Sequence, residues 1–97
     1  MKAKINPLVN YSILFTKQLK ASLLEIKIAF RQARELFLED PNHSSLRDHS
    51  LRGEFSGYRS INITEDYRAI YRKRIEVEKE FITFYMIGTH KELYKRK

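Results

Sequence analysis

The hydrophobic period of the chain changes once, near residue 41, and this change restricts the folds that the sequence can adopt. Before residue 41, apolar residues recur at steps of three and four, as they do in a helix with one buried stripe. After residue 57, apolar and polar residues alternate, as in strands that bury one face. Pro41 and Asn42 separate the two patterns and end the helix after Asp40. The helical stripe comprises Leu19, Leu23, Ile26, Phe30, Ala33 and Phe37.

A first strand is expected before the helical region. Residues 11–15 (YSILF) are rich in aromatic and β-branched side chains, which favour strands. Thr16 follows as a candidate N-cap for the helix, and Ser22 is a second candidate cap. One bent helix and a helical hairpin therefore both fit the pattern.

Three more strands are expected after a loop that contains Gly53 and Gly57, at residues 58–64, 67–74 and 80–88. The last of these is nearly all apolar, which is typical of an interior strand covered on both faces. The first strand is expected beside it or at an edge. The order predicts an α+β fold with a mostly antiparallel sheet of about four strands and N-terminal helices packed on one face. A length of 97 residues predicts a single domain, residues 1–97.

The composition narrows the function classes. The chain has no cysteine, so it contains neither disulfides nor thiolate metal ligands, which fits a cytoplasmic protein. No apolar run approaches the roughly 20 residues of a membrane span, and the N-terminal residues lack the apolar segment of a signal peptide. The net charge is +7, and residues 1–40 contribute +3 of it, so the excess is spread along the chain. Nucleic acid is the first acidic partner to consider.

Histidine exchanges protons near neutral pH, so the three histidines are candidate catalytic groups. His43 lies in a polar loop and is interpreted as a solvated residue. His49 follows Asp48 just before the expected sheet, and His90 follows Gly88 and Thr89 at the exit of the apolar strand. No histidine spacing typical of a metal site is present, and no metal is expected.

Polar residues of the expected hairpin at residues 58–74 each allow two interpretations. Asp66 is either a turn residue or a group that orients a catalytic base. Arg59 and Arg68 are either surface ion-pair partners or phosphate ligands. Tyr94 is either a packing anchor or an aromatic platform for a base. Taken singly, none of these residues decides the function.

Taken together, the motifs DHSLRG, GYR, DYRAIY and GTHKELY resemble those of the RelE/ParE superfamily of bacterial type II toxin–antitoxin systems. The closest resemblance is to its YafQ-like branch, and it covers residues 46–94 strongly and, more loosely, residues 11–20 (YSILFTKQLK) and the helical region that follows. The resemblance implies a small RelE-like fold and a toxin that cuts messenger RNA in the A site of the 30S subunit of the ribosome. In such toxins the 2′-hydroxyl attacks the adjacent phosphate without a metal or other cofactor. A cognate antitoxin protein is the expected second partner.

The resemblance also implies roles for single residues. His49 stands at the position of the general base and His90 at that of the general acid. Asp66 matches the acidic residue after the strand, and Tyr94 matches the C-terminal aromatic that positions a base. Further substrate contacts are expected from Tyr67, Arg52, Arg59 and Arg68.

Asn62 departs from the pattern, because the YafQ-like branch usually has a histidine there and other branches an arginine. Asparagine can hydrogen-bond to a phosphate oxygen but carries no charge. Loss of one charged contact to the transition state lowers a rate by about 10²–10³-fold. Arg59 is a poor replacement for the missing charge, because it is expected on the strand face opposite to Asn62. The outer face of the hairpin and its turn are expected to present Asn62, Asp66 and Tyr67 to RNA.

Two alternative functions remain. The ParE branch shares the fold and inhibits DNA gyrase, although such inhibitors need no acid–base residues at the positions of His49 and His90. A degenerate member that only binds RNA or an antitoxin is the second alternative, and Asn62 is the residue that favours it.

Overall fold

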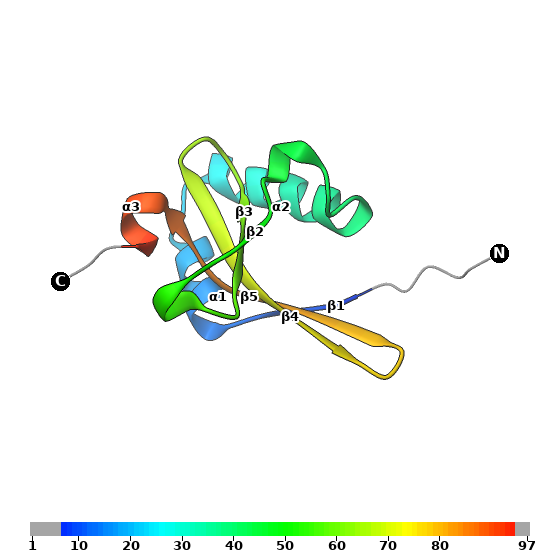
Figure 1. Cartoon of the computed structure of the whole chain (residues 1–97). Coiled ribbons are helices and arrows are strands. Elements are labelled where there is room, and N and C mark those ends of the chain that lie inside the picture. Colours follow the sequence, from blue (N-terminus) through cyan, green and yellow to red (C-terminus); the bar gives the residue numbers. More distant parts are fainter. Residues whose placement is uncertain (1–6, 95–97) are drawn as a thin grey trace.

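The computed structural model describes residues 7–94, which form an α+β fold with one five-stranded sheet (Figure 1). The strand order is β1-β5-β4-β3-β2. Only β1 runs parallel to its neighbour, and the other three pairings are antiparallel. The predicted fold class is confirmed, with one strand more than expected because a two-residue strand, β2 (His49–Ser50), forms within the predicted loop.

The chain begins with β1 (Leu8–Tyr11), followed by α1 (Ile13–Lys20). The prediction of a strand over residues 11–15 with Thr16 as the cap is therefore wrong. Ser12 is the N-cap, because its Oγ accepts a hydrogen bond from the Phe15 N–H at 2.9 Å and donates one to the Tyr85 carbonyl at 2.7 Å. This double contact starts the helix early and places Phe15 on it.

A second helix, α2 (Leu24–Glu39), completes a helical hairpin and ends at the predicted place. Its buried face meets α1 and the sheet in one aromatic cluster. Phe30 packs against both Phe15 of α1 and Phe84 of β5, with distances between ring centroids of 5.0 and 5.1 Å. Phe37 packs edge-on against Tyr71 of β4 at 4.8 Å. The helices thus cover one face of the sheet, which is called the helix face below.

The sheet consists mainly of a long hairpin of β4 (Tyr67–Glu76) and β5 (Lys79–Thr89). β5 lies between β1 and β4, as its apolar sequence predicts. The shorter β3 (Arg59–Asn62) pairs with β4, and β2 forms the edge beside it. A register shift near Ile70 makes Tyr85 an extra residue in β5. In Figure 1 the tip of the β4–β5 hairpin projects from one end of the molecule.

The other end of the sheet carries a one-turn helix, α3 (His90–Leu93), directly after β5. Two 3₁₀ turns, η1 (Ser44–Leu46) and η2 (Gly53–Phe55), lie in the loop between α2 and β3. The sheet face opposite to α1 and α2 is called the open face below. No helix within residues 7–94 is long and apolar enough to cross a membrane.

Candidate functional site

His49 lies on the edge strand β2 with its side chain on the open face. It pairs directly with Ser60, and directly paired residues of antiparallel strands point to the same side of a sheet. His49 Nδ1 lies 2.8 Å from the Arg47 carbonyl oxygen. Because a carbonyl oxygen only accepts hydrogen bonds, Nδ1 carries the proton. Nε2 of the neutral ring is therefore left as the atom that can accept a proton.

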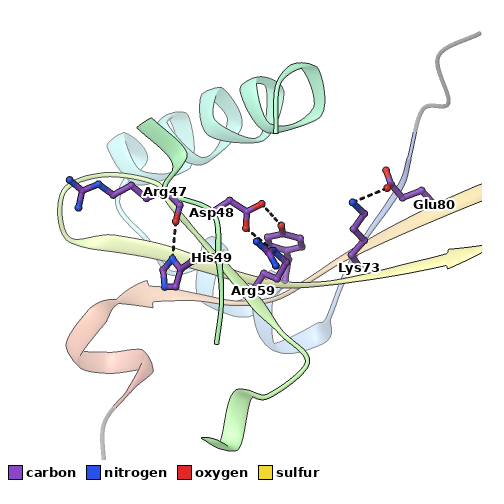
Figure 2. Close-up of polar contacts among 7 residues, drawn as sticks. Arg47, Asp48, His49, Arg59, Lys73 and Glu80 are labelled. Carbon is purple, nitrogen blue, oxygen red and sulfur yellow. Dashed lines mark hydrogen bonds and ion pairs between the residues drawn. The ribbon is translucent and has the colours of Figure 1, made fainter. Parts of the chain in front are cut away.

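The neighbouring Asp48 points to the helix face and is held by two partners, and Figure 2 shows the side chains of Asp48 and His49 leaving the chain in opposite directions. The Arg59 Nε–H donates to one carboxylate oxygen at 3.0 Å, and the Tyr71 hydroxyl donates to the other at 2.7 Å. Burial raises the pKa of Tyr71, and its hydrogen bond to Asp48 raises that pKa further. These contacts fix the loop from which His49 emerges.

Arg59 is therefore an ion-pair partner of Asp48 on the helix face, while Asn62 lies on the open face, as the alternation along β3 predicts. The cross-strand partner of Asn62 is Arg68. Their Cβ atoms are therefore about 5 Å apart on the same face. The Arg68 guanidinium also donates to the Glu65 carbonyl at 3.0 Å, which ties it to the turn. Arg68, unlike Arg59, is positioned to supply the charge that Asn62 lacks.

His90 and Asp66 meet at the end of the sheet. The His90 N–H donates to the Asp66 carbonyl at 3.1 Å, so the turn between β3 and β4 holds the first residue of α3. A capping box fixes the same helix: Thr89 Oγ1 accepts from the Glu92 N–H at 3.1 Å, and Glu92 Oε1 accepts from the Thr89 N–H at 2.9 Å. The exposed His90 ring lies against the Tyr94 ring at 4.7 Å.

The two histidines lie on opposite sides of the Asn62–Arg68 pair. β2 is three strand positions from β5, so the backbones at His49 and at β5 are separated by about 14 Å. The strands between them carry Asn62 and Arg68. Of the predicted contacts, Arg52 is exposed directly before η2, in the loop that leads from His49 to β3.

Tyr67 does not share the face of Asn62, so the expectation that the hairpin presents it there is wrong. It pairs with Thr89 and packs against the apolar core on the helix face. The reason is the period of two, since Tyr67 is adjacent to Arg68, which lies on the open face.

Several features of the site were missed in the sequence. The Asp48–Arg59–Tyr71 cluster joins residues far apart in the chain, and no spacing announces it. Phe55 is also part of the site region, because its ring lies 5.7 Å from the Tyr94 ring. One signal in the sequence was available for this aromatic group. The alternation along β3 places Tyr58 on the same face as Asn62, and the Tyr58 ring lies 6.5 Å from that of Phe55.

Neither His49 nor His90 lines any of five clefts formed by residues 7–94. A cleft of about 420 Å³ lies beside Asp48, Arg59 and Phe37, on the helix face. His49 and His90 are instead exposed on the surface, where a polymer can reach both. Within residues 7–94, no group of three or more histidine or acidic side chains is arranged to hold a metal ion.

The model of one protein family, described as the bacterial toxin of type II toxin–antitoxin system YafQ, matches residues 9–95. The chain belongs to the YafQ toxin family. It is thus a toxin of the type II toxin–antitoxin class, as the motifs around His49 and His90 indicate. No curated protein sequence matches the chain.

Solved structures support the same fold. YafQ from Escherichia coli superimposes with a TM-score of 0.75 at 22% identity, covering 91% of this chain and 98% of that one. The structure of the E. coli DinJ–YafQ toxin–antitoxin complex gives a TM-score of 0.74 at 22% identity, covering 93% of this chain and 99% of that one. A YoeB/ParE toxin from Agrobacterium tumefaciens gives a TM-score of 0.71 at 14% identity, covering 86% of this chain and 98% of that one. The YafQ-type toxin fold therefore spans most of the chain.

Proposed function

We propose that this YafQ-family toxin is an endoribonuclease that cuts messenger RNA at A-site codons on the ribosome. The observation that carries the proposal is the open face of the sheet. On this face His49, whose Nε2 can accept a proton, lies on one side of the Asn62–Arg68 pair and His90 lies on the other, and this arrangement supports the proposal. Cleavage by a 2′-hydroxyl needs these three components: a base, phosphate ligands and an acid.

In the proposed reaction, His49 Nε2 removes the proton from the 2′-hydroxyl, whose oxygen then bonds to the adjacent phosphorus. Arg68 and Asn62 contact the non-bridging oxygens, where negative charge accumulates. The bond from phosphorus to the 5′-oxygen breaks, and His90 gives its proton to that oxygen. The products are a 2′,3′-cyclic phosphate and a 5′-hydroxyl, and neither a metal nor another cofactor takes part in these steps.

The remaining groups position the RNA. Tyr94, beside His90, offers a ring face on which a base can stack. Arg52 is an exposed cation on the approach to His49 and serves as a phosphate contact. Asp66 holds the start of α3, and therefore His90, through its carbonyl. Arg59 and Tyr67 have no direct role in this scheme, because both lie on the helix face.

A cognate antitoxin is the proposed cytoplasmic partner. YafQ of E. coli is found in a complex with DinJ, and the present chain has the same fold. The net charge of +7 favours an acidic antitoxin segment that covers the open face and its two histidines.

The test is cleavage of a defined message on purified ribosomes, with the cut positions mapped. We expect cuts within the A-site codon and none in the same RNA without ribosomes. A gyrase supercoiling assay on the same protein tests the alternative. Inhibition of gyrase without RNA cleavage, or the absence of both activities in a folded protein, would contradict the proposal.

A further inference from the structure

A second group of arginines lies on the open face, farther along β4 from the histidines. Arg68, Arg72 and Arg74 occupy alternating positions with Ile70 between them, so a period of two places them on one face. Arg72 and Arg74 are exposed, and they pair with Thr83 and Phe81 in the half of the β4–β5 hairpin nearer its tip. The row from Arg68 to Arg74 is about 20 Å long at the rise of an antiparallel strand.

Aromatic rings accompany these arginines. The Arg72 guanidinium lies over the Tyr58 ring at 5.7 Å, and the Arg74 guanidinium lies over the Phe81 ring at 4.5 Å. The Tyr58 ring in turn lies 5.2 Å from that of Tyr85. With Thr83, these side chains line a cleft of about 310 Å³, which is called the arginine–aromatic cleft below.

The cleft is connected to His90 by a row of rings. The centroid of the His90 ring lies 4.7 Å from that of Tyr94, and the centroid of the Tyr94 ring lies 5.7 Å from that of Phe55. Phe55 lies 6.5 Å from Tyr58, which lines the cleft itself. All of these rings are only partly buried or exposed, so the row forms part of the surface.

Among residues 7–94, acidic side chains neutralise the charge of the cleft only in part. Arg74 Nε lies 3.1 Å from a Glu76 carboxylate oxygen, with side-chain exposures of 63% and 55%. Ion pairs this exposed contribute little, and the other guanidinium nitrogens stay accessible. In the part of the chain that the structure describes, Arg72 forms no ion pair with a carboxylate.

We propose that the arginine–aromatic cleft binds single-stranded RNA, outside the residues that carry out cleavage. Rings that stack on bases next to guanidinium groups that bind phosphates are the combination by which proteins hold single strands without reading their sequence. The row of rings directs such a strand toward His90. The cleft would thus hold RNA that flanks the cut position, and its binding does not depend on the cleavage chemistry.

The test is a binding titration of the full chain with a fluorescent single-stranded RNA whose riboses carry 2′-O-methyl groups. This RNA cannot be cut by a 2′-hydroxyl, so the result is independent of the proposed cleavage. In the variant with both Arg72→Gln and Arg74→Gln we expect weaker binding and a shallower salt dependence. The slope of log K against log salt should decrease by about 1.4, which corresponds to two lost phosphate contacts on a single strand. Tyr85→Leu should weaken binding about tenfold through lost stacking.

The matched control is the variant with both Lys20→Gln and Arg31→Gln, which removes the same charge from exposed positions of α1 and α2. It should change the slope less than the cleft variant does. Equal effects of the two double variants would overturn the proposal. Tighter binding of an RNA duplex than of the single strand would also overturn it, because the bases of a duplex are not free to stack on the rings of the cleft. Thermal unfolding of each variant checks that it is folded.

Discussion

At the scale of single residues, β3 and β4 present two arginines on opposite faces of the sheet. Arg68 lies beside Asn62 on the open face, and Arg59 is bound to Asp48 on the helix face. Arg68→Gln should lower the single-turnover cleavage rate on ribosomes by about 10²–10³-fold, because a cation next to the phosphate is lost. Arg59→Gln is the matched control, because a glutamine amide can still donate to Asp48 and the Tyr71 hydroxyl keeps its own bond to that carboxylate. It should leave that rate at the wild-type order of magnitude. Equal losses in both variants would contradict the assignment of Arg68 to the phosphate.

Tyr71 gives a prediction about stability and pH. Burial and the hydrogen bond to Asp48 raise the pKa of Tyr71, so the folded protein keeps this phenol neutral at a pH where the unfolded chain ionises it. The stabilisation is complete below the ordinary tyrosine pKa of about 10 and is lost as the pH rises above it. Tyr71→Phe should lower the free energy of unfolding by about 2 kcal/mol at neutral pH, because a hydrogen bond to a carboxylate disappears.

Denaturant unfolding at neutral pH and above pH ~10 measures both effects. The wild type should lose more stability between the two conditions than Tyr71→Phe does. Parallel losses in the two proteins would show that the Tyr71 hydroxyl does not contribute to the alkaline sensitivity.

At the scale of elements, α3 is a single turn whose geometry depends on its cap. A helix this short has little stability of its own, so the Thr89–Glu92 capping box and the contact to Asp66 hold His90 in place. Thr89→Ala should destabilise α3 by about 1 kcal/mol and should lower the cleavage rate. Thr89→Ser keeps the hydroxyl and should restore the rate. Hydrogen exchange at the Glu92 amide reports the loss of the cap, and slow exchange in Thr89→Ala would contradict this role.

The N-terminal element shows why part of the fold was mispredicted. Residues 11–15 have the composition of a strand, yet Ser12 makes a cap and a contact to the Tyr85 carbonyl. Tertiary packing of Phe15 against Phe30 and Phe84 outweighs the local propensity. In contrast, the interior position of β5 in the strand order was predictable from its apolar sequence, although the helices cover only one of its two faces.

The site was predictable to a similar extent. The period of two along β3 correctly separated Asn62 from Arg59, since that period fixes faces independently of register. The place of Tyr67 and the cluster around Asp48 were missed, because both depend on contacts between elements. The row of rings from His90 to Tyr85 was missed for the same reason.

At the scale of the whole molecule, folding gathers dispersed features onto one face. The basic residues are spread along the sequence, and the alternation along β4 places three of them, Arg68, Arg72 and Arg74, on the open face. The same face carries His49 and ends at His90. The toxin thus has a helix face that carries the apolar core and an open face that carries the groups proposed to contact RNA.

The measurement that tests the central claim most directly is the pH dependence of single-turnover mRNA cleavage on ribosomes. The wild type, His49→Gln and His90→Gln are compared, and the end groups of the products are identified. The account predicts a bell-shaped dependence of the wild-type rate on pH. His49 must be neutral, so that its Nε2 can accept a proton, and His90 must be protonated, so that it can donate one. His49→Gln should lose the acidic limb and His90→Gln the alkaline limb, each at a rate lowered by about 10²–10⁴-fold. A 2′,3′-cyclic phosphate should end the upstream fragment. A profile that neither substitution changes, or no cleavage by the folded wild type, would contradict the assignment of this face as a ribonuclease site.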